Sequence, residues 1–328
     1  MVDAARGGDE IAFRELVAPF QRELRAHCYR MSGSLHDADD LLQESMLRAW
    51  KGLAGFEGRS SVRTWLYKVA TSACLDALDR RGPRLLPMDL GPAATDPSAP
   101  IPVPADPSWL EPFPGPMDDV ATPEARYGAR ESVALAFLTA LQLLPAKQRA
   151  VLLLRDVLGW QATECAELLE LSVPAVNSAL QRARDTLATR ELPPTSSTPD
   201  DEGIASLLAR YVHAWEQADV SVLVSLLRED ATLAMPPMAA WFHGASVIGA
   251  SIGGMVLTPD AKGRFRLVAI SANGAPAFAA YERDPKTGQF LAAAVHVLDV
   301  RGGKIAGIMA FLEPSLFPRF GLAPALAA

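Results

Sequence analysis

The sequence predicts a multidomain protein with two all-α modules followed by a C-terminal α+β domain. Apolar residues recur every three to four positions in two separate blocks, which is typical of amphipathic helices. Between these blocks, residues 83–123 hold 12 of the 26 prolines, a composition that excludes an ordinary helix or a central strand. Near the C-terminus, two helical segments precede a series of strand-like segments, the order of an α+β domain. The predicted parts are 1–82, a proline-rich acidic linker over 83–130, 131–190, and 204–320.

The first module is predicted to be helical. From His36 to Leu53 the apolar residues keep a three-to-four spacing, and the other face of this helix is acidic. A second amphipathic helix is expected from about Thr64 to Arg80, after a loop over 55–62.

The second module is predicted to hold four helices, at about 131–144, 145–158, 161–169 and from Pro174 onward. Pro145 and Pro174 suit the first turn of a helix, where a backbone N–H needs no partner. The short third helix, the turn at 171–173 and the last helix form a helix-turn-helix pattern. The last helix is expected to bury a narrow apolar stripe and to present polar residues around it.

The C-terminal part is predicted to begin with helices at 204–218 and 220–227. Strand-like segments follow at about 231–235, 265–272, 275–283, 290–301 and 304–311. The stretch 284–288 (DPKTG) is a hairpin signal between two of them. Helices followed by an antiparallel run of strands indicate a small α+β domain.

Charge limits the function classes. The net charge of the chain is -7, whereas a free-standing nucleic-acid-binding domain is usually basic. Each helical module is neutral, and the linker carries -4. Such a surface releases few counterions from DNA, so another subunit would have to supply much of the affinity.

Localisation and cofactor chemistry also follow from composition. The three cysteines are far apart and match neither a zinc spacing nor a disulfide framework. The N-terminus lacks a secretory apolar stretch, and no run is long enough for a membrane span, so a cytoplasmic protein is expected. No phosphate-binding loop, nucleophile elbow or metal cluster occurs, and no cofactor or metal is expected.

Two separated stretches carry a resemblance to a known family. Residues 37–50 (DADDLLQESMLRAW) and 63–70 (RTWLYKVA) look like region two of extracytoplasmic-function RNA polymerase sigma factors. Residues 144–156 (LPAKQRAVLLLRD) and 175–184 (AVNSALQRAR) resemble region four of the same family. Two ordered motifs are more specific than a helix-turn-helix alone. The resemblance covers roughly residues 5–190.

The resemblance implies a transcription-initiation subunit that binds core RNA polymerase at its clamp and flap regions, recognises promoter DNA and is not an enzyme. The acidic helix would be the polymerase-binding surface, through Asp39, Asp40, Gln43 and Glu44. The loop 55–62 with the helix after it would open the −10 element, and the last helix of the second module would read the −35 element. The implied DNA-binding residues are Phe56, Arg59, Ser60, Ser61, Arg63, Lys68, Asn177, Gln181, Arg182 and Arg184. A solvated helix face is the alternative interpretation of each charged surface.

The tail is similar to SnoaL-like domains, through 215–219 (WEQAD), 226–231 (LLREDA), 235–238 (MPPM) and 241–244 (WFHG). The resemblance implies a cone-shaped α+β domain that regulates the chain in cis. A small-molecule ligand is a candidate partner of this domain, and plain core packing is the competing interpretation. The candidate pocket residues are Trp215, Met235, Trp241, His243, Phe278 and His296.

Two alternative functions stay open at this stage. One is a SnoaL-like cyclase or isomerase fused to a DNA-binding module, because relatives of this fold include enzymes. Its acid–base candidates, such as His243 and Asp230, follow no spacing that forces a catalytic pair. The other is a ligand-responsive repressor that acts without polymerase, which the neutral charge of both helical modules disfavours.

Overall fold

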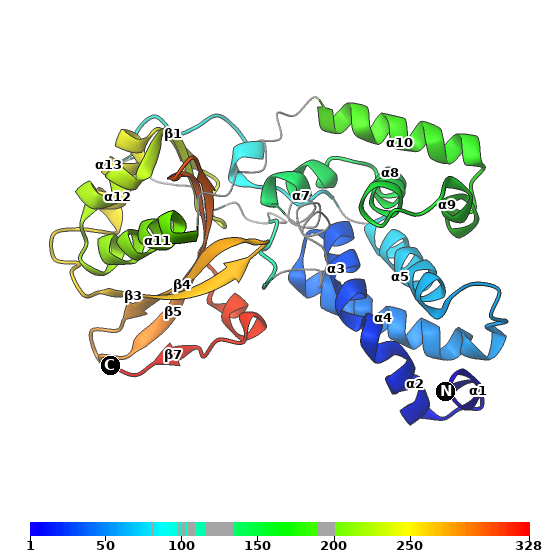
Figure 1. The fold of residues 1–328 in the computed structure, drawn as a ribbon. Helices are drawn as coiled ribbons and strands as arrows, with labels where there is room; N and C mark the ends of the chain where they lie inside the picture. Colours follow the sequence, from blue (N-terminus) through cyan, green and yellow to red (C-terminus); the bar gives the residue numbers. More distant parts are fainter. Residues whose placement is uncertain (80–81, 98, 100–102, 104–108, 116–133, 189–200) are drawn as a thin grey trace. The chain divides into compact units, whose positions relative to one another are not determined.

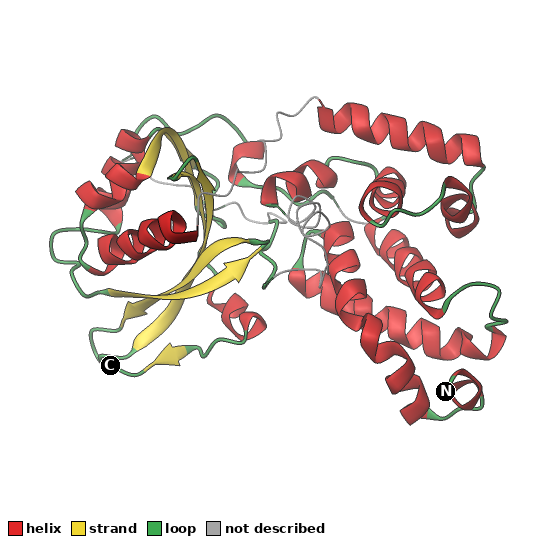
Figure 2. Ribbon diagram, viewed as in Figure 1, coloured by secondary structure: helices red, strands yellow, loops and turns green. Residues whose placement is uncertain are grey.

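The computed structural model describes residues 1–79, 82–97, 99, 103, 109–115, 134–188 and 201–328. The chain forms two compact units. The first comprises residues 1–84 and 117–193, and the second 85–116 and 194–328. Within the described residues, the first unit is helical and the second combines helices with one sheet, which confirms the predicted fold class (Figure 2). None of the described helices is both long and apolar enough to cross a membrane.

The first unit contains both helical modules (Figure 1). Its first module holds α1 (Val2–Arg6), α2 (Glu10–Val17), α3 (Gln21–Ser32), α4 (Leu35–Gly52) and α5 (Val62–Leu78). Its second module holds α7 (Leu135–Gln142), α8 (Ala146–Leu152), a π-helical turn (Leu153–Val157), α9 (Ala162–Leu169) and α10 (Val173–Ala188). Residues 116–133 and 189–200 lie outside the described residues, so the start of the helix predicted over 131–144 does too.

Local chemistry fixes where these helices begin and end. Ser34 caps α4 by accepting a hydrogen bond from the Asp37 N–H at 3.1 Å, and Ser61 caps α5 through the Thr64 N–H at 3.0 Å. At α9 the side chain of Glu164 accepts the Gln161 N–H, half of a capping box. Glu170 ends α9 in the left-handed conformation, with φ of 55°. This left-handed residue turns the chain between α9 and α10.

The second unit is a curved seven-stranded sheet with helices against one face (Figure 1). The helices are α11 (Asp201–Glu216), α12 (Val220–Leu226) and α13 (Ala245–Met255). The strand order is β2-β1-β6-β5-β4-β3, with β7 beside β5. The β1–β6 pair is parallel and the other pairs are antiparallel. The strands are β1 (Leu227–Ala234), β2 (Trp241–His243), β3 (Phe265–Ala272), β4 (Ala275–Arg283), β5 (Phe290–Arg301), β6 (Lys304–Phe311) and β7 (Ala325–Leu326).

One helix of this unit was not predicted. The glycines of α13 lower its helix propensity, but two of them permit close packing on α12. A Cβ on Gly249 would lie 2.5 Å from Val224 Cγ2, and one on Gly253 would lie 3.3 Å from Val220 Cγ2. The short strands β2 and β7 were also missed, because neither is long enough to show an alternating pattern.

Candidate functional site

The four predicted polymerase-binding residues of α4 differ in their exposure and in their hydrogen-bond partners. Asp40, Gln43 and Glu44 are exposed. Glu44 accepts a hydrogen bond from Arg48 at 2.7 Å, and Asp40 lies 3.8 Å from the His36 ring. Asp39 is half-buried and accepts two hydrogen bonds from Arg25. The surface open to a partner therefore consists of Asp40, Gln43 and Glu44, and Asp39 lies at its edge, held by Arg25.

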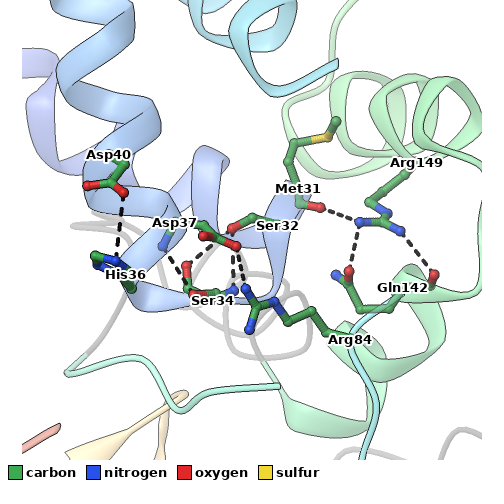
Figure 3. A network of polar contacts seen from close by, with 9 residues as sticks. All are labelled: Met31, Ser32, Ser34, His36, Asp37, Asp40, Arg84, Gln142 and Arg149. Carbon is green, nitrogen blue, oxygen red and sulfur yellow. Dashed lines mark hydrogen bonds and ion pairs between the residues drawn. The ribbon is translucent and has the colours of Figure 1, made fainter. Parts of the chain in front are cut away.

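A buried polar network fixes the start of α4 (Figure 3). Asp37 is buried and accepts a hydrogen bond from Arg84 at 2.5 Å, while its backbone N–H donates to the Ser34 cap. A buried carboxylate needs such a partner, because desolvation of an unpaired charge is costly. The network orients the acidic surface one turn further along the helix.

A second buried node, around Arg149, joins the two helical modules inside the first unit (Figure 3). The guanidinium donates to the Met31 carbonyl at the end of α3. It also donates to Gln142 Oε1 at 2.8 Å, the Gln142 carbonyl at 3.0 Å and the Leu144 carbonyl at 3.1 Å. Burial lowers the pKa of Arg149 to about 10, which leaves it a cation at neutral pH. The sequence patterns did not single out this residue.

The loop before α5 is exposed, and its aromatic residue, Phe56, packs against Trp65 of α5. The Phe56 ring lies 5.0 Å from the Trp65 ring, and both side chains are half-buried. Arg59, Ser60 and Ser61 are exposed; Arg59 pairs with Glu57, and Ser61 is the cap of α5. The loop therefore presents polar groups around one supported aromatic ring.

The two cations that follow on α5 differ in their surroundings. Arg63 binds Glu23 through three hydrogen bonds of 2.7 to 3.0 Å and lies over the Tyr67 ring. These hydrogen bonds raise the pKa of Arg63. Lys68 is exposed. Arg63 would have to leave Glu23 before it binds a phosphate, but an exposed ion pair is typically worth less than about 1 kcal/mol.

Helix α10 buries one face and exposes the other. Val176, Ala179, Leu180 and Ala183 are buried against α8 and α9. The four predicted DNA-binding residues of this helix, Asn177, Gln181, Arg182 and Arg184, are all exposed. Arg184 donates to both oxygens of Asp156, at 2.9 and 2.7 Å, and this contact raises the pKa of its guanidinium. The exposed face offers the amide and guanidinium groups that read base edges in a major groove.

The second unit contains a cavity of about 690 Å³ between the helices and the sheet. Of the predicted pocket residues, Trp215, Met235 and His296 line it. Phe278 belongs to the buried core instead, and Trp241 and His243 lie on the edge strand β2. Met238, Met255 and Ile252 also line the cavity and were not predicted as pocket residues. Apolar spacing alone does not distinguish residues around a cavity from residues of a filled core.

The described part of the linker is hydrogen-bonded to both edges of this sheet. At β2, Trp241 Nε1 donates to the Gly91 carbonyl at 2.8 Å, and the Ala94 N–H donates to the Trp241 carbonyl at 2.7 Å. At β3, Asn273 Oδ1 accepts the Phe113 N–H at 2.9 Å, and the Gly115 N–H donates to the Ser271 carbonyl at 2.9 Å. The linker thus supplies partners for edge strands that would otherwise expose unpaired backbone groups.

The acid–base candidates His243 and Asp230 do not line the cavity. His243 is exposed, and Asp230 is exposed and paired with Arg228. That pairing lowers the pKa of Asp230, which keeps it ionised rather than ready to donate a proton. Among the described residues, no group of three metal-ligating side chains occurs.

Comparison with known proteins places three family models along the chain. Sigma-70 region 2 matches residues 16–84, Sigma-70 region 4 matches 134–187, and the SnoaL-like domain matches 208–308. The ECF RNA polymerase sigma factor SigG of Mycobacterium tuberculosis (strain CDC 1551 / Oshkosh) is 47% identical over 325 residues, which cover 98% of this chain and 86% of SigG. SigM of the same species (strain ATCC 35801 / TMC 107 / Erdman) is 32% identical over 181 residues, covering 55% of this chain and 78% of SigM.

A solved structure shares the fold of the chain. The crystal structure of the Mycobacterium tuberculosis extracytoplasmic function sigma factor SigJ matches with a TM-score of 0.61 and 23% identity. The match covers 94% of this chain and all of that one.

Proposed function

The chain belongs to the extracytoplasmic-function sigma factors of RNA polymerase, and from this premise we propose which of its surfaces bind polymerase and DNA and how its tail controls them. As a sigma factor it recognises promoters for core polymerase. The proposed parts are residues 1–82 for polymerase and the −10 element, 83–130 as the linker, 131–190 for the −35 element and 204–320 as the regulatory domain. The order of the two helical modules along the chain carries the proposal.

Polymerase docks on the exposed acidic surface of α4, formed by Asp40, Gln43 and Glu44, with Asp39 at its edge. Support comes from the buried Asp37–Arg84 pair, which holds the start of this helix in place. Acidic groups on a rigid helix attract a basic partner and set its register.

Promoter DNA contacts two exposed surfaces. Around the −10 element, the loop from Phe56 to Ser61 takes up an unstacked base, while Arg63 and Lys68 hold phosphates, which position the strand. At the −35 element, α10 enters the major groove through Asn177, Gln181, Arg182 and Arg184.

The tail acts as a regulator in cis rather than as an enzyme. Its support is the pair of hydrogen-bonded contacts between the linker and the two edges of its sheet. A tethered contact acts at high effective concentration, so a few hydrogen bonds suffice to hold the linker. The dispersed acid–base candidates give no observation that favours the fused-enzyme alternative.

A polymerase pull-down tests the docking surface. Reversing charge in the double variant Asp40→Lys/Glu44→Lys should weaken capture by core polymerase at least tenfold. The matched control, Asp3→Lys/Glu10→Lys, reverses two exposed charges on α1 and α2 and should leave capture unchanged. Equal capture of both variants would contradict the assignment of α4.

In vitro transcription tests the regulatory tail. A chain ending at Arg190 should change promoter use or polymerase affinity, because its linker is no longer held. The full-length double variant Trp241→Phe/Asn273→Gly, which loses one linker hydrogen bond at each edge, should shift activity in the same direction. Transcription that is identical for all three chains would rule out control by the tail.

A further inference from the structure

The lining of the cavity in the second unit is mostly apolar, with four charged residues, Arg264, Glu282, Arg283 and Asp284, and one buried polar cluster. Trp215 and His296 line the cavity, with ring centroids 4.6 Å apart. Behind them the Tyr211 hydroxyl lies 3.1 Å from His296 Nδ1. All three side chains are at least nine-tenths buried. Burial lowers the pKa of His296 to about 4, so this cluster is uncharged at neutral pH.

One hydrogen-bond donor of this cluster is unsatisfied. Trp215 Nε1 is buried and has no hydrogen-bond partner among the described residues. Burial raises the pKa of Tyr211, and the neighbouring Trp215 side chain offsets part of this rise. An unsatisfied buried N–H costs about 1–3 kcal/mol. Since Trp215 lines the cavity, a guest that offers an acceptor oxygen would remove this cost.

The chemistry of the wall defines the guest. The volume of about 690 Å³ lies within the range of small-molecule sites, and Met235, Met238 and Ile252 provide apolar contact. Among the charged lining residues, Arg264 is paired with Glu282 at 2.8 Å, Asp284 accepts hydrogen bonds from Lys286 and Thr287 of its own turn, and Arg283 is exposed. A guest that fits this wall is uncharged and mainly apolar, with an acceptor group at its buried end.

The cavity is joined to the linker by a short segment of chain. Met235 and Met238 line the cavity, and the Met238 N–H donates to the Met235 carbonyl at 2.8 Å. Three residues later, Trp241 holds the linker at Gly91 and Ala94. Ala94 itself packs against the apolar cluster to which Trp215 and Met235 belong. A guest that packs on the two methionines therefore acts on the same seven-residue segment that holds the linker.

We propose that this cavity binds an uncharged, mainly apolar small molecule that accepts a hydrogen bond from Trp215 Nε1–H, and that its binding strengthens the hold of residues 235–241 on the linker. The proposal rests on the proposed function in one respect, namely that the tail is the element that holds the linker. A guest that binds only the linker-held state stabilises that state by mass action.

Nile red, an uncharged aromatic dye with a carbonyl acceptor, is a suitable probe for the full-length chain. Its fluorescence titration should give saturable binding. Trp215→Phe keeps an aromatic ring but removes the donor, and should weaken binding about tenfold. Ala293→Trp places a large side chain on a lining residue and should abolish binding, whereas the control Ala306→Trp, on β6 outside the lining, should not. Equal affinities of all four chains would overturn the proposed site.

Hydrogen–deuterium exchange tests the coupling to the linker. At a dye concentration of ten times Kd, exchange of the Ala94 N–H should slow by up to about tenfold. The Gly115 N–H, which binds at the opposite edge, is the internal reference and should slow less. Dye that binds without slowing Ala94 exchange would overturn the coupling. Neither experiment contains polymerase or DNA, so a failed polymerase pull-down would leave both results interpretable.

Discussion

Arg149 shows how much one side chain organises the first unit. A single guanidinium serves carbonyl acceptors from α3, from the end of α7 and from the turn between α7 and α8, all in a buried setting. Its planar, forked donors match such a set of acceptors, which the point charge of a lysine cannot. Because these acceptors are buried, the loss of the guanidinium would leave several of them unsatisfied at once.

We predict that Arg149→Met lowers the free energy of unfolding of the first unit by about 3 kcal/mol, because each acceptor left without its donor costs about 1 kcal/mol or more. Arg149→Lys should recover less than half of this loss. Urea unfolding measures both values. The control Arg182→Met, on the exposed face of α10, should change stability by less than about 0.5 kcal/mol. A loss below 1 kcal/mol for Arg149→Met would contradict the structural role.

At the scale of elements, the proposed DNA contacts of α10 compete with an ion pair inside the first unit. Arg184 is bidentate on Asp156, so in the proposed DNA complex a phosphate or base would have to replace that carboxylate. The pair is exposed, and the replacement is therefore inexpensive. The neighbouring Arg182 is exposed on the same helix.

Releasing Arg184 should strengthen promoter binding. We predict that Asp156→Asn tightens the binding of the reconstituted polymerase to promoter DNA by up to about fivefold, the equivalent of an exposed ion pair of 1 kcal/mol. Arg182→Ala should weaken binding and lower its salt dependence by about one counterion. Both follow from titrations at several salt concentrations, with Asp3→Asn as the control. Weaker binding of the Asp156→Asn variant would contradict this prediction and would mean that the ion pair with Asp156 positions Arg184 for binding DNA.

The β3 edge of the second unit depends on one asparagine. Asn273 and Gly274 form the tight turn between β3 and β4, with φ of 52° and 68°. The side-chain Oδ1 of Asn273 accepts a hydrogen bond from the Phe113 N–H, and the backbone N–H of Asn273 donates to the Phe113 carbonyl. One residue thus serves both the hairpin and the linker.

These two roles can be separated by substitution. Asn273→Gly keeps the left-handed backbone but removes the acceptor, so the Phe113 amide should exchange at least fivefold faster while β3 and β4 keep their protection. Asn273→Asp retains an acceptor oxygen and should leave that rate unchanged. Loss of protection in the strands themselves would mean that the side chain also stabilises the sheet.

At the scale of the whole molecule, each unit buries one neutral histidine. His27 lies 2.9 Å from Thr71 in the first unit, and burial, with a smaller contribution from Arg30, lowers its pKa to about 3. His296 is its counterpart in the second unit, with a pKa of about 4. In the unfolded chain both histidines titrate near pH 6.5. Below that pH the unfolded state binds protons that the folded state does not, so stability falls with decreasing pH.

Acid should therefore weaken both units over the same pH window. From pH 7 to pH 5 we expect each unit to lose on the order of 2 kcal/mol, or about 1.4 kcal/mol per pH unit below 6.5. The slowest-exchanging amides of each unit measure this loss. His27→Gln can still bond to Thr71 and should flatten the pH dependence of the first unit alone. An unchanged slope in that variant would place the acid sensitivity elsewhere.

Much of the architecture was predictable because its signals are local. The apolar period predicted α4, α5 and α9, and alternation bounded by turn residues predicted β3 to β6. The polar residues of α10 were predicted to face outward, and Asn177, Gln181, Arg182 and Arg184 are all exposed. The sequence also identified Trp215, Met235 and His296, which do line one cavity. Their role as a binding site stays a prediction.

What only the tertiary structure decided depends on partners far away in the chain. From the local sequence, Gly249 and Gly253 disfavour a helix. Their close packing on Val220 and Val224 of α12 explains why a helix forms there. The sequence predicted an extended linker, but its hydrogen bonds to Trp241 and Asn273 join residues about 150 and 160 positions apart. Periodicity reports which face of an element is apolar and nothing about which distant backbone groups meet it, because edge pairing and close packing are properties of the assembled sheet.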